Sequence, residues 1–133
     1  QATLAVRRQS LTGKNPWTYG ESLINGDFCY IDMAVPFFGS GSAVAASDWQ
    51  ASASLTNTGR YIIAFKDGLQ SREQISSNAC ASISTGAGAS AQFRLGFPGK
   101  TNGDGVADHV NFGSANSGTP SYRPVLMINY HTP

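Results

Sequence analysis

Short apolar segments that alternate with polar residues constrain the fold of this chain more than any other feature. This period of two predicts β-strands, because successive side chains of a strand point to opposite faces of a sheet. In one such segment Cys29, Ile31 and Met33 share a face, so we expect Cys29 to point into the core. The predicted strands are residues 2–6 (ATLAV), 28–35 (FCYIDMAV), 60–65 (RYIIAF, apolar on both faces and predicted to be central), 91–97 (AQFRLGF), 109–112 (HVNF) and 124–130 (PVLMINY).

Clusters of Gly, Asn, Ser and Pro separate these segments, as in residues 12–16 (TGKNP) and 114–120 (SANSGTP). Antiparallel strands use such loops, whereas parallel strands need helical crossovers. Helical candidates are few, namely residues 43–55 (AVAASDWQASASL) and 66–75 (KDGLQSREQI), and neither carries a sustained apolar stripe. We predict one all-β domain over residues 1–133, an antiparallel two-sheet β-sandwich of jelly-roll or Ig-like type with little helix.

The composition favours an extracellular β protein. Only 13% of the residues are charged, and the polarity comes from neutral Ser, Thr and Asn side chains. The net charge of +1 provides no field that would attract a polyanion, which argues against nucleic-acid binding. No apolar run approaches the roughly 20 residues that span a bilayer, so no membrane span is predicted. We expect the protein to be extracellular or at a cell surface.

Cys29 and Cys80 are the two cysteines of the chain. In an extracellular protein such a pair predicts a disulfide. The bond would close a loop of about 50 residues and stabilise the fold by roughly 4 kcal/mol, because it restricts the unfolded chain. The alternative is a pair of buried free thiols.

Residues 101–110 (TNGDGVADHV) raise the question of a metal site. Asn102, Asp104 and Asp108 are candidate ligands, and calcium is the cation that such oxygen donors suit. An EF-hand-type alignment, however, places Lys100 at the first ligand position, where a carboxylate is needed. A turn between two strands explains the same residues, because Asn-Gly and Asp-Gly pairs tolerate positive φ. We favour the turn and expect no bound cofactor.

Aromatic side chains in loops are the strongest candidates for ligand binding. Trp17 and Tyr19 lie in the turn-rich segment 14–22, and Asp48 directly precedes Trp49. Flat aromatic rings stack on the apolar faces of sugars, while nearby carboxylates bind hydroxyl groups. These residues predict a surface that binds polysaccharide. The alternative, particularly for Trp49, is a ring that caps the end of the sandwich core.

The sequence gives little support for catalysis. Its eight carboxylates are scattered, and His109 and His131 lack the ligand spacing of a zinc site. A glycosidase pair is defined by the spatial separation of its carboxylates, which the sequence does not provide. We therefore predict that the protein is not an enzyme and acts through binding surfaces.

The C-terminal third resembles a known family. A Phe-x-Leu strand is followed by residues 101–114 (TNGDGVADHVNFGS) and by a closing segment, residues 121–130 (SYRPVLMINY), in which Arg123-Pro124 leads into the last strand. This order resembles the end of secreted bacterial β-sandwich modules of the DNRLRE type, which are related to carbohydrate-binding modules. The resemblance implies a β-sandwich that binds sugar. The Ser-Arg-Glu signature of those modules is replaced here by residues 114–116 (SAN).

A different function follows from the N-terminal segment. The modules that the chain resembles have further residues before their equivalent of this segment, so a sandwich lacking those strands would expose a sheet edge. Residues 1–11, with Thr3, Leu4 and Val6 in alternation, are suited to pair with the sheet of another copy. Head-to-tail pairing that does not close predicts an extracellular filament. The other interpretation is an ordinary first strand in its own sheet.

Overall fold

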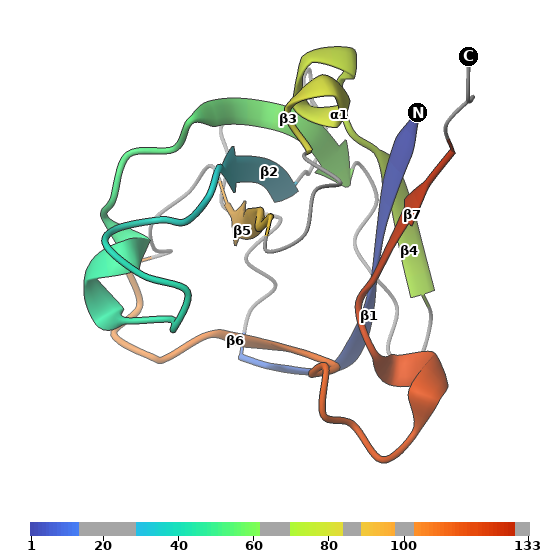
Figure 1. Cartoon of the computed structure of the whole chain (residues 1–133). Coiled ribbons are helices and arrows are strands. Elements are labelled where there is room, and N and C mark those ends of the chain that lie inside the picture. The colour runs from blue at the N-terminus through green and yellow to red at the C-terminus, as the bar shows by residue number, and fades with distance from the viewer. Residues whose placement is uncertain (14–28, 62–69, 84–88, 98–102, 130–133) are drawn as a thin grey trace, which may run out of the picture.

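The computed structural model describes residues 1–13, 29–61, 70–83, 89–97 and 103–129. Within these ranges the strands form two antiparallel sheets that face each other without closing into a barrel (Figure 1). The all-β, two-sheet sandwich predicted from the alternation is confirmed. The elements are β1 (Ala2–Thr12), β2 (Cys29–Ala34), η2 (Ala46–Trp49), β3 (Leu55–Tyr61), β4 (Gln70–Gln74), α1 (Ser77–Ser82), β5 (Gln92–Gly96), β6 (His109–Phe112), η3 (Pro120–Tyr122) and β7 (Val125–Ile128).

The first sheet is organised around β1, its central strand. One edge of β1 pairs with β4, in the register Leu4↔Glu73. The other edge pairs with β7 along the first half of β1 and with β6 along the second half, where Thr12 lies opposite His109. Among the described residues, β4, β6 and β7 make their sheet pairings with β1 and not with one another. The sheet therefore depends on β1.

The second sheet has the order β3-β2-β5, with β2 in the centre. Cys29, Ile31 and Met33 of β2 are fully buried, so the predicted inward face of this strand is confirmed. Strand β3 lies at an edge, and Arg60 and Tyr61 are its last two residues. The prediction of a central strand that begins at Arg60 is therefore wrong for its described part, and residues 62–65 lie outside the described ranges.

The core lies between the two sheets and joins β1 to β2, β3 and α1. Leu4 and Val6 of β1 pack with Ile31 and with the other buried residues of β2. The Tyr61 hydroxyl donates a hydrogen bond of 2.9 Å to the carbonyl oxygen of Leu4, which links β3 to β1 across the core. Burying an aliphatic side chain of this size contributes roughly 1.5–3 kcal/mol. This apolar burial is the main force that holds the sheets together.

One side of the sandwich is closed where β3 meets the end of β4. The backbone N–H of Ser76 donates to Thr58 O at 2.6 Å, and that of Ile75 donates to Ala2 O at 3.1 Å. Helix α1 begins directly afterwards, with the Ser76 hydroxyl accepting a hydrogen bond from the backbone N–H of Ala79. These bonds connect the second sheet to the first at this side.

The two helical candidates turn out differently from the prediction. Residues 70–74 of the segment 66–75 form strand β4, because pairing with β1 outweighs their weak helical preference. The segment 43–55 contains only the 3-10 turn η2 before β3 begins at Leu55. Helix α1 follows a Ser N-cap that the sequence analysis did not single out. In the described part of the chain, no helix has the length and apolar character needed to cross a membrane.

Candidate functional site

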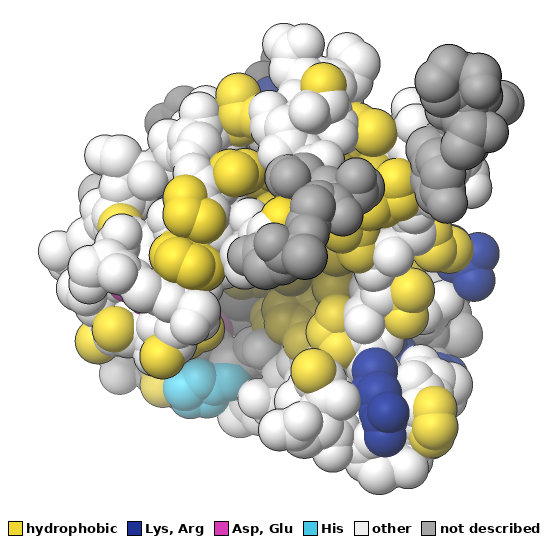
Figure 2. Space-filling view, viewed as in Figure 1, with side chains coloured by type: hydrophobic (Ala, Val, Ile, Leu, Met, Phe, Trp, Pro, Cys, Tyr) yellow, Lys and Arg dark blue, Asp and Glu magenta, His cyan; other side chains and the backbone are white. Residues whose placement is uncertain are grey.

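The opposite side of the sandwich, between β5 and β6, contains an open apolar pocket with a volume of about 490 Å³. Figure 2 shows this face hollowed, with hydrophobic side chains gathered in the hollow. Both bounding strands are edge strands among the described residues, β5 beside β2 and β6 beside β1. The pocket is the gap between these two edges. Its inner apolar surface comes from Phe38, Phe93, Leu95, Phe97, Val110 and Phe112.

The rim of the pocket is formed by the loop that carries η2. Trp49 is 69% exposed and Val44 is 89% exposed, and both line the pocket. Asp48, next to Trp49, is buried instead. The two candidate residues therefore have different roles in the structure. The indole ring of Trp49 lies at the surface, whereas the buried side chain of Asp48 makes a hydrogen bond within the loop. Val44 had no distinguishing signal in the sequence.

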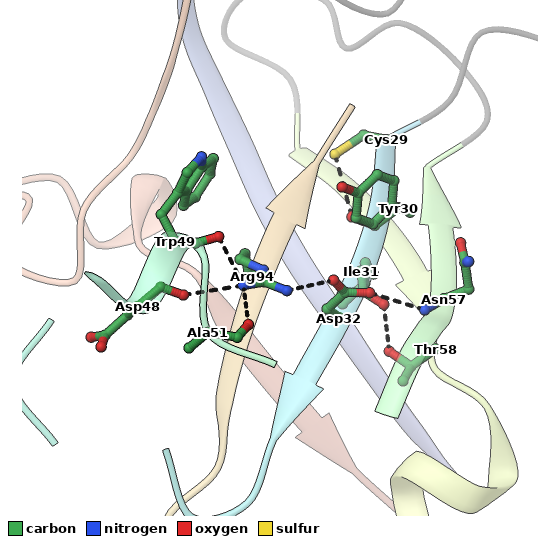
Figure 3. Close-up of polar contacts among 10 residues, drawn as sticks. All are labelled: Cys29, Tyr30, Ile31, Asp32, Asp48, Trp49, Ala51, Asn57, Thr58 and Arg94. Carbon is green, nitrogen blue, oxygen red and sulfur yellow. Dashed lines mark hydrogen bonds and ion pairs between the residues drawn. The ribbon is translucent and has the colours of Figure 1, made fainter. Parts of the chain in front are cut away.

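Arg94 of β5 fixes this loop against the second sheet (Figure 3). Its Nη1 donates to the carbonyl oxygens of Asp48, Trp49 and Ala51 at 3.1, 3.0 and 2.8 Å. Its guanidinium also stacks over the Phe38 ring, 4.5 Å from the centroid. One side chain thus binds three carbonyls at the end of η2, of which that of Asp48 also accepts from the backbone N–H of Ala51.

The charge of Arg94 is balanced by Asp32 of β2. Arg94 Nη2 and Asp32 Oδ2 form a salt bridge of 2.9 Å, and both side chains are largely buried. The backbone N–H of Asn57, which has a φ of 51°, donates to the other oxygen, Asp32 Oδ1 (Figure 3). The alternation places Asp32 on the face away from the core, and the loop that Arg94 anchors buries it there. A buried pair of this kind is costly to break, because removing one partner leaves an uncompensated charge.

The other polar side chains at the pocket are also engaged within the chain. Asp48 Oδ2 accepts a hydrogen bond of 2.8 Å from the backbone N–H of Ala45. Gln92 accepts from the N–H of Phe38 through Oε1 and donates to Ser42 O through Nε2. A ligand at this pocket therefore meets mainly apolar and aromatic surface, and its main contribution to binding would come from apolar contact.

The predicted disulfide is absent: Cys29 and Cys80 are free thiols. Cys29 is fully buried at the start of β2, and Cys80 lies half-buried on α1, packed against the same core. Burial raises the pKa of Cys29 to about 12, and a hydrogen bond with the backbone of Gly96, which favours the thiolate, offsets only part of this rise. The alternative of two unbridged thiols, which spacing alone left open, describes this structure.

The candidate calcium loop forms a turn in its described part, which is the interpretation that the sequence favoured. Gly103 and Gly105 have φ values of 76° and 74°, a left-handed conformation that glycine adopts without strain. Asp104 Oδ1 accepts a hydrogen bond of 2.8 Å from the backbone N–H of Val106. Among the described residues, no three His, Cys, Asp or Glu side chains are grouped as metal ligands, and Asp108 lies against Gly13. Asn102 lies outside the described residues.

The remaining sequence candidates divide between β1 and the undescribed segment 14–28. Trp17 and Tyr19 lie in that segment, so the structure does not place them beside Trp49 or elsewhere. Leu4 and Val6 are buried in the core, and Thr3, which precedes Leu4, is half-buried on the other face. The segment proposed to pair with another copy is thus the central strand of its own sheet in this structure.

Arg94 is a residue of the candidate site to which the sequence assigned no role. It lies within the predicted strand 91–97, and its partners lie in segments far from it along the chain. A lone Arg between two apolar residues of a predicted strand is the one available signal. It indicates a polar partner above the sheet without identifying that partner.

Comparison of the chain with protein-family models, with curated proteins and with solved structures gives no match. The resemblance to DNRLRE-type modules therefore stays a prediction. The class that fold and site define is a two-sheet β-sandwich that is closed on one side and has an apolar pocket on the other.

Proposed function

We propose that this chain is a non-catalytic structural subunit of an extracellular filament, in which β1 of one copy completes the first sheet of the next copy. The observation that carries this proposal is the position of β1. It is the central strand of its sheet, and its partner residues lie between Gln70 and Ile128, far along the chain. Removing β1 leaves β4 without a neighbour on one side and β6 and β7 without one on the other.

Exchange of β1 between copies preserves the interactions of the strand. The same pairings to β4, β6 and β7 form whether β1 comes from the same chain or from another, and Ala2, Leu4, Ala5 and Val6 bury the same surface. The balance between the two arrangements then depends on the connector, residues 14–28, and on protein concentration. Donation that passes from copy to copy without closing produces a filament.

Two further features support an extracellular structural role. The chain has few charges, and its net charge of +1 allows copies to pack closely without strong repulsion. Its polar surface is rich in neutral Ser, Thr and Asn side chains, a composition that suits an extracellular β protein. No step of the proposed function requires a metal ion or a cofactor.

The first test is the solution mass of the 133-residue chain by light scattering, with electron microscopy of the same sample. We expect polymers whose length increases with concentration. A monodisperse species of 14.0 kDa at all concentrations would show that β1 stays in its own sheet and would overturn the proposal.

A complementation experiment identifies the donated strand. A chain lacking residues 1–11 should not polymerise, and a synthetic peptide of residues 1–12 should bind it in a one-to-one complex. The peptide with Leu4→Asp and Val6→Asp should fail to bind, because it would place two charges in the core. A control peptide with Thr3→Ser should bind as the parent does. Normal polymers from the truncated chain would contradict strand donation.

Glycan recognition is the second candidate function, and the exposure of Trp49 favours it. An indole ring that is 69% exposed at the rim of an aromatic pocket provides a stacking surface for a sugar. Affinity electrophoresis in gels containing polysaccharides tests this function. Trp49→Ala should abolish retardation by the polysaccharide that retards the parent chain, and Trp17→Ala tests the other predicted ring. If no polysaccharide retards the parent chain, this candidate is wrong.

A further inference from the structure

The open pocket between β5 and β6 lies next to the point where an exchanged β1 would leave the sheet that it completes. Thr12, the last residue of β1, pairs with His109, and Gly13 lies against Asp108 just before β6. Leu11 pairs with Val110, and Val110 lines the pocket. The chain of the donating copy would therefore emerge beside His109, next to Val110, one of the two residues of β6 that line the pocket.

From this geometry we infer that the apolar pocket is the contact surface between successive copies, covered in the acceptor by the copy that donates β1. This inference rests on the proposed strand exchange, because the exchange fixes where the donor emerges. The occupant is a second copy of this chain, and its contact with the pocket continues the interface that β1 makes along β6.

The chemistry of the surface around the exit point fits such a contact. Val44 and Trp49, exposed at the rim, are two of the four large hydrophobic side chains that are exposed among the described residues. A third, Val106, precedes His109 by three residues. Val44 and Trp49, together with the apolar lining of the pocket, form exposed apolar surface of the kind that marks interaction sites.

The charged groups at the pocket favour an uncharged partner surface. Arg94 is paired with Asp32, and Asp48 accepts a hydrogen bond from Ala45 within its own loop. The charge of Arg94 is thus balanced inside the subunit. A second copy, in which only 13% of the residues are charged, can cover such a surface without having to pair these charges, because they are already satisfied within the subunit.

Fluorescence of Trp49 tests the inference directly. Trp17→Phe leaves Trp49 as the single tryptophan of the chain. On assembly its emission should shift to shorter wavelength, and its quenching by acrylamide should fall several-fold relative to the freshly refolded, dilute chain. Assembled polymers in which Trp49 stays as accessible as in the dilute chain would overturn this inference and leave strand exchange intact. A failure of the chain to assemble at any concentration would overturn both.

Two substitutions to Asp provide a matched test of the same surface. Val44→Asp places a charge at the rim and should raise the concentration needed for polymer growth about tenfold or more, because the contact would have to desolvate a carboxylate. Thr56→Asp is the control, since Thr56 is exposed on β3, does not line the pocket and lies on a strand that does not pair with β1. Thermal unfolding of both variants checks that each still folds. Equal effects of the two substitutions on assembly would contradict the inference.

Discussion

The two sides of the sandwich differ in how completely they bury the core. On the closed side, backbone hydrogen bonds from Ser76 to Thr58 and from Ile75 to Ala2 join the sheets, and Ile75 is 2% exposed. On the open side, Phe93 and Val110 face a pocket of about 490 Å³ and are only half-buried. The two sheets therefore bury the core completely along one side of the sandwich and leave it partly exposed along the other.

This difference predicts that substitutions on the two sides affect stability and the proposed assembly separately. The closed side is held by backbone bonds and complete apolar burial, which depend little on a partner. On the open side, apolar surface remains exposed that a second molecule could bury. Arg94 holds the loop at the rim of this surface in place. Substitutions on the closed side should mainly change the free energy of unfolding, whereas substitutions on the open side should mainly change assembly.

Alkaline pH should produce the largest effect on the stability of the core. Burial raises the pKa of Cys29 from 9.0 to about 12 and also raises the pKa of Tyr61, its partner across β2 and β3. Because the folded state holds these protons more tightly than the unfolded state, the stability is fully present below pH 9 and is lost as the pH rises towards 12. For Cys29 the loss is on the order of 4 kcal/mol.

Urea unfolding at pH 8, 10 and 11 measures this loss, and Cys29→Ala provides the control. The variant is less stable at pH 8 because it lacks the buried sulfur, but its stability should decline less between pH 8 and 11. If stability declines equally with pH in the two proteins, Cys29 does not contribute to the pH dependence.

Truncation of the core compares the two sides directly. Ile75→Ala should lower the free energy of unfolding by about 3 kcal/mol, because Ile75 is buried and leaves a cavity. Leu95→Ala, which enlarges the open pocket, should cost about half as much, since Leu95 is only half-buried. Urea unfolding at neutral pH measures both values. A larger loss for Leu95→Ala would mean that the open side is closed in solution.

Glu73 should give a smaller effect, and its substitution should stabilise the folded state. It lies on β4 against β3, and burial raises its pKa above 4.5 despite a hydrogen bond from the Arg60 backbone N–H. Protonated Glu73 contributes to the free energy of unfolding below pH 4.5, and this contribution is lost as the pH rises through the pKa of the folded state. Glu73→Gln should therefore unfold at a higher temperature than the parent chain at pH 7, with a gain within about 1 kcal/mol. Calorimetry at pH 4 should show a smaller difference.

The smallest expected effect is a difference in thiol reactivity that leaves stability unchanged. With a maleimide at pH 7, half-buried Cys80 should be modified, whereas Cys29 should react only after unfolding because its thiol is buried and protonated. Mass spectrometry without reductant should find one label on the native chain and two on the denatured chain. No label on the denatured chain would indicate that the two cysteines form a disulfide after all.

Much of the fold was predictable from the sequence, but the edges of the sheets were not. The alternation predicted β1, β2, β5, β6 and β7 and the inward face of β2. Strand β4 was missed because its residues Gln70–Gln74 are all polar and have no apolar period. The neighbouring strand determines the structure of such a segment, because its backbone N–H and C=O groups find their hydrogen-bond partners only by pairing with that strand.

The candidate site was predictable only in fragments. Asp48 and Trp49 were identified because an aromatic beside a carboxylate is recognisable locally. The roles of Arg94 and Asp32 depend on a salt bridge between different strands, and that of Val44 depends on exposure beside a pocket. None of these roles follows from local spacing, since the partners are distant in sequence.

The sequence by itself determined the fold class, because a period of two between turn clusters can bury its apolar face only by forming sheets. The tertiary structure alone decided that β1 is the strand on which the first sheet depends, that Cys29 and Cys80 are free thiols, and that the sandwich opens between β5 and β6. The physical reason is that side-chain direction is a local property of a strand. Sheet order and the closing of a margin depend on contacts between segments far apart along the chain.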